Sequence, residues 1–195
     1  MMMMRARILA ARLKLKQLLH DSSGVGAIEF AILFPILVML YIGAFEITIG
    51  LSVSKRASRA AGSVADIVTQ QQNVTKSTLT QISSVANAIF VPYNTTKMQI
   101  KLTGITIDAS ANPKVLWSWT NTSTTAPYTA NSAVTGIPAD MLKASSFLVR
   151  SELSIPYRLL AFSPAFLPGN LQTLTISRTY YYRQRQNDSI PCGDC

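Results

Sequence analysis

The sequence contains very few of the residues on which catalytic and metal-binding sites depend. Its only histidine is His20, and it has just two cysteines among 195 residues. A catalytic triad with histidine and a site with several histidine ligands are therefore excluded for the chain beyond His20. The carboxylates of the C-terminal region are dispersed, and no glycine-rich phosphate-binding loop is present. We expect a protein that is not an enzyme and that uses no cofactor and no metal.

Basic residues are in excess, but they do not form a cluster. The chain has 18 Lys and Arg against 9 Asp and Glu, which gives a net charge of +9. Five of the 18 precede Gly24, and the other 13 occur singly or in pairs. Nucleic-acid binding needs a basic patch that follows the phosphates. We therefore expect no nucleic-acid partner.

One long uncharged run dominates the N-terminal third. The 16 residues from Phe30 to Phe45 carry no charge, and Glu29 and Glu46 stand at its two ends. Extended to residues 25–51, a helix of this sequence would be about 40 Å long, enough to cross a bilayer. More basic residues precede the run than follow it closely, which favours a cytoplasmic N-terminus and an extracytoplasmic C-terminal region. We therefore predict a single-pass membrane protein.

Residues 1–24 are short, basic and poor in acidic residues. The apolar run that follows is longer than that of a usual secretory signal, and no convincing small-residue cleavage site comes after it. Two interpretations remain open at this point. Either cleavage occurs before the apolar run, or residues 1–23 stay attached as a basic tail near anionic lipid.

The residues at the start of the apolar run resemble a known cleavage pattern. Gly24 is followed by Val25-Gly-Ala-Ile-Glu29-Phe30, which resembles type IV prepilins, whose peptidase cuts after a glycine. The sequence that continues from Glu29 to Gly50 is similar to TadE-like proteins, pseudopilins of the tight-adherence (Tad or Flp) pilus. In that family a Glu-Phe-Ala start, a proline and a second glutamate before a glycine recur; here the last three are Pro35, Glu46 and Gly50.

The resemblance implies a function in pilus assembly, and hence in adherence and biofilm formation. It implies cleavage between Gly24 and Val25 by prepilin peptidase, and insertion in the bacterial inner membrane with a periplasmic C-terminal domain. Other pilins or pseudopilins and the assembly platform would be the partners. Glu29, the fifth residue after the cleavage site, would set the axial register of neighbouring subunits together with Phe30.

Three further residues of the run invite a physical interpretation. Pro35 removes one helical hydrogen bond and should kink the helix. Glu46 and Gly50 are candidates for helix packing, although we expect Glu46 simply to lie at the second membrane interface. Charged groups inside a membrane are costly unless paired. Glu29 and Glu46, which border the uncharged run, are therefore candidate functional residues.

The remaining sequence predicts a pilin-like α+β fold: the long helix, a second helix and an antiparallel sheet. Small and apolar residues recur every three or four positions from Val53 to Val68, which extends the helix to about Thr69 in the helical region 52–92. A second helix should end by Pro92. The region 93–195 is rich in strands, with a bulge expected at Gly104, where the alternation of apolar residues changes phase.

The C-terminal sequence Cys192-Gly-Asp-Cys195 is the one local chemical motif. Two thiols cannot build a four-cysteine zinc site, so we expect a small disulfide loop outside the cytoplasm. Two alternatives to pilus assembly stay open. One is an extracytoplasmic thiol-exchange protein that uses Cys192 and Cys195, and the other is a membrane-tethered binding domain.

Overall fold

A computed structural model describes residues 24–158, 173–185 and 188–195 of the chain. Its contacts divide the chain into two compact units, which meet between Phe45 and Glu46. The first unit contributes the start of helix α2 (Val25–Thr69), which includes Pro35. The predicted leader lies outside the described residues except for Gly24. The second unit, residues 46–195, is termed the folded unit below.

The folded unit begins with the rest of α2. The predicted stripe from Val53 through Ala57, Ala60 and Val64 to Val68 is buried, with no member more than 2% exposed. Helix α3 (Lys76–Phe90) follows after a short turn. Its first turn is capped by Thr75, whose hydroxyl accepts a hydrogen bond from the Thr78 amide at 3.2 Å. Both predicted helices are confirmed.

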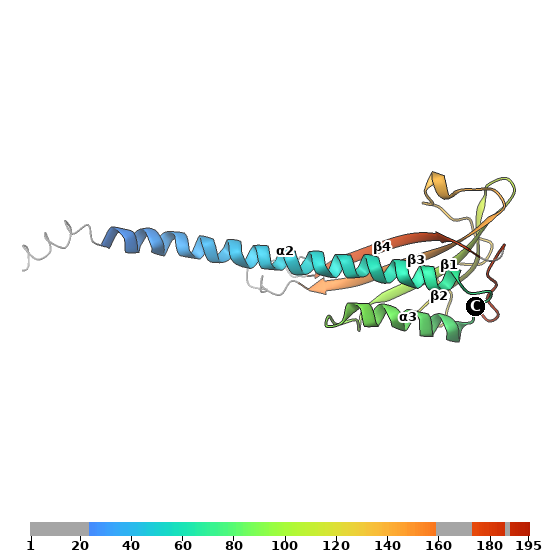
Figure 1. Cartoon of the computed structure of the whole chain (residues 1–195), viewed down its shortest axis with the longest axis horizontal. Coiled ribbons are helices and arrows are strands. Elements are labelled where there is room, and N and C mark those ends of the chain that lie inside the picture. The colour runs from blue at the N-terminus through green and yellow to red at the C-terminus, as the bar shows by residue number, and fades with distance from the viewer. Residues whose placement is uncertain (1–23, 159–172, 186–187) are drawn as a thin grey trace, which may run out of the picture. The chain divides into compact units, whose positions relative to one another are not determined.

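A four-stranded antiparallel sheet completes the folded unit (Figure 1). Its strands are β1 (Gln99–Ile107), β2 (Pro113–Thr120), β3 (Ser146–Arg158) and β4 (Thr173–Arg183), and their spatial order is β2-β1-β3-β4. A short 3-10 helix, η2 (Ala139–Met141), lies in the long connection before β3. The predicted α+β class, a long apolar helix followed by a second helix and an antiparallel sheet, is confirmed.

The sheet packs apolar residues on both of its faces, which explains the change of phase in β1. On the first face, residues such as Ile100 and Leu102 join the core that contains α2 and α3. Beyond Gly104, Ile105 and Ile107 belong to a second, smaller cluster, which is completed by Val115, Val134 and Leu148. The register of β1 against β2 shifts between Gly104 and Ile105. The bulge is thus where it was predicted, although the extra residue, Leu116, lies in β2.

Gly104 is required by the close approach of a tryptophan. A Cβ atom at this position would lie 2.5 Å from two atoms of the Trp117 indole and 2.9 Å from Phe147. The indole nitrogen donates a buried hydrogen bond to the Ile190 carbonyl at 2.7 Å. Trp117 therefore joins the strand bulge to the C-terminal tail, and only a glycine leaves room for it.

Replacing Gly104 with alanine should lower the free energy of unfolding by about 2–3 kcal/mol, the usual cost of overpacking a core. The new methyl group has to displace the indole, which also disturbs its hydrogen bond to Ile190. Chemical denaturation of the full-length protein in detergent, followed by tryptophan fluorescence, measures the change.

The matched control is Gly193→Ala, because a Cβ at Gly193 meets nothing within 4 Å. Its stability should stay within about 0.5 kcal/mol of the wild type, as for other surface substitutions. Equal losses in the two variants would contradict the packing described for Gly104.

Candidate functional site

The first unit exposes its apolar residues on every side. The most apolar window of α2 contains no buried residue, and the helix is long and apolar enough to cross a membrane. Phe30 and Phe34 contact one another along the helix, with ring centroids 5.3 Å apart. An apolar helix that its own chain leaves uncovered requires lipid or other apolar helices around it. Among the residues that the structure describes, this is the one helix of that kind, which indicates a single-pass membrane protein.

The residues of the cleavage pattern lie at the beginning of this exposed helix. Gly24, Val25, Glu29 and Phe30 are all exposed. Helix α2 begins at Val25, so the junction between Gly24 and Val25 is also the helix start. The described residues offer the Glu29 carboxylate no hydrogen bond or ion pair. The cleavage and register functions of these residues stay predictions.

Glu46 occupies a different environment from Glu29. It is only 5% exposed, and its Oε1 accepts a hydrogen bond from the Tyr157 hydroxyl at 2.6 Å. Glu46 lies seven positions before Val53, which is about two helical turns. This glutamate therefore extends the buried stripe of α2 toward the N-terminal end of the helix. Sequence reasoning placed Glu46 at an interface and missed its partner, because Tyr157 is 111 residues away in the chain.

Both partners of the contact between Glu46 and Tyr157 are buried. A buried carboxylate is costly unless it is hydrogen-bonded. Burial, and then the bond to the Glu46 carboxylate, raise the pKa of Tyr157 well above its usual range. The phenol therefore stays protonated and remains a donor. Gly50, one turn after Glu46, lies beside the same ring, which a Cβ there would approach to 3.9 Å.

Two arginines attach other elements to α2. Arg56 donates to the carbonyls of Ile89 and Val91 at 2.7 and 2.9 Å, and so satisfies the C-terminal end of α3. Arg178 of β4 donates to the hydroxyls of Ser58 and Ser54 at 3.2 and 2.5 Å. Sequence reasoning counted Arg56 among the charges that flank the membrane helix. The structure shows that it instead bonds within the folded unit.

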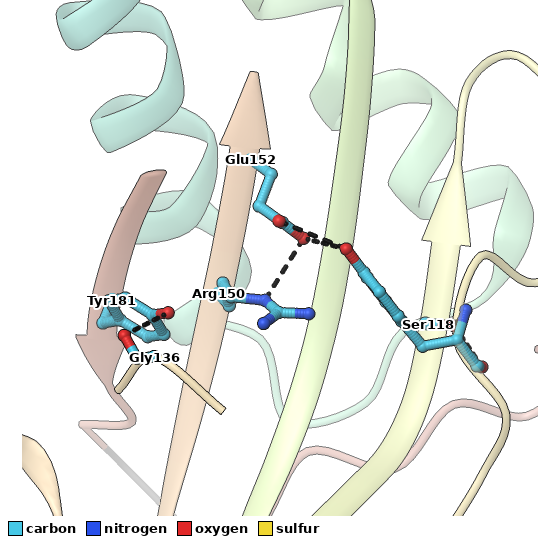
Figure 2. A network of polar contacts seen from close by, with 6 residues as sticks. Ser118, Gly136, Arg150, Glu152 and Tyr181 are labelled. Carbon is cyan, nitrogen blue, oxygen red and sulfur yellow. Dashed lines mark hydrogen bonds and ion pairs between the residues drawn. The ribbon is translucent and has the colours of Figure 1, made fainter. Parts of the chain in front are cut away.

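A polar network holds the long connection between β2 and β3 against the outer face of the sheet (Figure 2). The Tyr128 hydroxyl donates to both carboxylate oxygens of Glu152, at 3.2 and 3.0 Å. Arg150 forms an ion pair with the same carboxylate at 3.2 Å and stacks on the Tyr128 ring. Burial, followed by the bond to Glu152, raises the pKa of Tyr128. Glu152 is thus held by both Tyr128 and Arg150, although the buried Nε of Arg150 makes no hydrogen bond in this ion pair.

The C-terminal tail is fastened to the start of α3. Cys192 and Cys195 are joined by a disulfide. Between them, the Asp194 carboxylate accepts a hydrogen bond from the Lys76 amide at 2.7 Å, a favourable contact at a helix N-terminus. Ile190 is fully buried in the core. The disulfide loop therefore presents Asp194 to α3, a function that the sequence did not reveal.

The exposed apolar helix and the folded unit together describe a membrane-anchored α+β protein. The exposed apolar helix is termed the anchor below. One comparison with known families found a match to part of the chain. The family model for TadE-like proteins matches residues 24–66, a range that begins at Gly24 and contains Glu29, Pro35 and Glu46. The resemblance to TadE-like proteins of the Tad pilus system is thereby confirmed over this range. No curated protein and no solved structure matches the chain.

The contact between Glu46 and Tyr157 can be measured with a double-mutant cycle. Tyr157→Phe should lower the free energy of unfolding by about 2 kcal/mol, because it removes a hydrogen bond to a buried carboxylate. The double variant Glu46→Leu/Tyr157→Phe removes both partners and should be about 1–3 kcal/mol more stable than the sum of the single effects predicts. Denaturation of the full-length chain in detergent gives all four values.

The matched control pairs Glu46→Leu with Tyr181→Phe. Tyr181 donates its own hydroxyl bond to the Gly136 carbonyl at 3.1 Å and does not bond to Glu46. This pair should be additive within about 0.5 kcal/mol. If both cycles gave the same coupling energy, the bond between Glu46 and Tyr157 would have no specific energetic role.

Proposed function

We propose that this chain is a non-enzymatic pseudopilin that supports assembly of a tight-adherence pilus, and through it adherence and biofilm formation. The observation that carries the proposal is the match of the TadE-like family model to residues 24–66. The match includes the start of the apolar helix, where the cleavage pattern lies, and the turns that enter the folded unit. The exposed apolar surface of the helix is also what subunit packing within a membrane requires.

The proposed membrane is the bacterial inner membrane. The five basic residues before Gly24 exceed the three that closely follow the uncharged run within helix α2, Lys55, Arg56 and Arg59, so the N-terminus faces the cytoplasm. The folded unit is then periplasmic, a compartment in which the disulfide between Cys192 and Cys195 persists. Prepilin peptidase, other pilins or pseudopilins and the assembly platform are the proposed partners.

Glu29 is the residue to which we assign a function in assembly. Its carboxylate is exposed on an apolar helix and receives no partner from the described residues. In a membrane such a group is costly unless it is paired. After cleavage the new α-amino group of Val25 supplies a charge of opposite sign, on the same subunit or on a neighbour. An intersubunit pair of this kind fixes axial register.

Cleavage after Gly24 should give a mature chain that begins at Val25. Intact-mass measurement of the protein extracted from membranes of a strain with prepilin peptidase tests this directly. A strain without the peptidase should retain the chain from Met1. If both strains yielded a chain that begins at Met1, the proposed processing would be wrong.

Glu29→Ala should leave membrane insertion unchanged and strongly reduce the number of surface pili. The substitution removes the proposed pair between the Glu29 carboxylate and the Val25 α-amino group, which sets the axial register of neighbouring subunits. Counting pili by electron microscopy, with immunoblots of the membrane fraction, separates the two effects. Asp140→Ala, which removes an exposed carboxylate from the folded unit, is the matched control and should leave piliation normal. Normal piliation with Glu29→Ala as well would end the assembly function of Glu29.

A further inference from the structure

The end of the folded unit that carries Glu46 is termed the base. The strand pairing identifies the other segments at this end: β1 begins here at Gln99, opposite Ser154 of β3, while β3 ends at Arg158, opposite Thr173, the first residue of β4. The base is also the end that follows Phe45, the last residue of the uncharged run.

A cavity of about 540 Å³ opens at the base, beside α2. Part of its lining consists of buried, largely apolar side chains, Val53, Ile155 and Tyr157, which are 2%, 3% and 8% exposed. Two exposed cations, Lys97 and Arg158, stand among the lining residues. The full lining is Ile49, Val53, Tyr93, Asn94, Thr96, Lys97, Ile155, Pro156, Tyr157 and Arg158. It contains no carboxylate.

The carboxylates near the base are already engaged. Glu46 accepts the Tyr157 hydroxyl, and Glu152 is bound by Arg150 and Tyr128. Within the described ranges, neither Lys97 nor Arg158 forms an ion pair. The sequence between Arg158 and Thr173 has no Asp or Glu either. The two cations therefore attract an anion from outside the chain.

The connection of the chain keeps this cavity close to the end of the apolar run. Ile49, in the cavity lining, lies four residues after Phe45, which is about 6 Å along a helix. The polar layer on each side of a bilayer is also about 6 Å thick, from a total of 40–45 Å around a hydrocarbon core of about 30 Å. A cavity at that level with apolar walls and cationic groups matches an amphiphile that carries a negative charge.

We infer that this cavity binds an anionic phospholipid, whose phosphate lies between Lys97 and Arg158 and whose apolar part lies against Ile49 and Ile155. Each basic residue near an anionic lipid surface contributes about fivefold in affinity. Binding would hold the base against the membrane and limit rotation of the folded unit about its anchor. This inference rests on membrane insertion and does not depend on a function in pilus assembly.

Lipid retention by the full-length protein tests the inference. The delipidated chain in detergent receives phosphatidylglycerol and phosphatidylcholine at equal concentration, and native mass spectrometry counts the lipids retained. The wild type should retain phosphatidylglycerol in preference. The variant Lys97→Glu/Arg158→Glu should lose that preference by a factor on the order of ten.

The matched control is Lys114→Glu/Lys143→Glu, which makes the same change of charge at the opposite end of the sheet. Lys114 is at the start of β2 and Lys143 precedes β3, and both side chains are exposed. This control should keep the preference for phosphatidylglycerol. Lys97→Gln/Arg158→Gln, in which the charges are only removed, should lose most of it. Melting curves should show that all variants fold, since every altered side chain is exposed.

Several results would overturn the inference. Equal retention of both lipids by the wild type would do so, as would an equal loss in the control at the opposite end. Displacement of the lipid by millimolar inorganic phosphate would show a site for free anions instead. A change of oligomeric state in Lys97→Glu/Arg158→Glu, with lipid retention unchanged, would identify the cavity as a contact between copies of the chain.

Discussion

The structure depends on a change along one helix, from an exposed apolar segment to a segment that is packed in the folded unit. Helix α2 is apolar on all sides up to Phe45, and from Glu46 onward it buries only one stripe. The hydrogen bond between Glu46 and Tyr157 stands at that change. It joins Glu46, the first buried residue of the helix, to Tyr157, the second-last residue of strand β3. The sheet is thus attached to α2 at the start of its buried stripe. A buried carboxylate with a matched donor specifies this register more closely than apolar contacts alone, because a shift would leave the charge without its donor.

The rest of the folded unit is arranged around α2. Small residues at Ala57, Ala60, Ala61 and Gly62 allow the sheet to approach the helix closely, and a Cβ at Gly62 would lie 3.2 Å from the Tyr182 hydroxyl. Helix α3 is then held at both of its ends by distant parts of the chain. Arg56 of α2 satisfies its last carbonyls, while Asp194 in the disulfide loop satisfies its first turn. These contacts orient both helices and the tail. The polar groups that make them are used for packing.

Each of the two units contributes a different part of the proposed function. Residues 24–45 carry the cleavage pattern, Glu29 and an apolar surface that only lipid or neighbouring helices can cover. The folded unit contributes the base, in which Glu46 is hydrogen-bonded to Tyr157, Glu152 is ion-paired with Arg150, and the cations Lys97 and Arg158 are exposed.

The sequence by itself determined the elements that depend on local periodicity. The uncharged run defined the anchor, the stripe from Val53 to Val68 predicted the continuation of the helix, and the phase change at Gly104 predicted the bulge. The match to TadE-like proteins also rests on one continuous stretch, residues 24–66. Only the tertiary structure decided which polar groups meet: Glu46 with Tyr157, Tyr128 with Glu152, and Asp194 with the start of α3. Periodicity shows which residues share a face of one element, but these hydrogen bonds join residues 24 to 118 positions apart and depend on how the elements pack together.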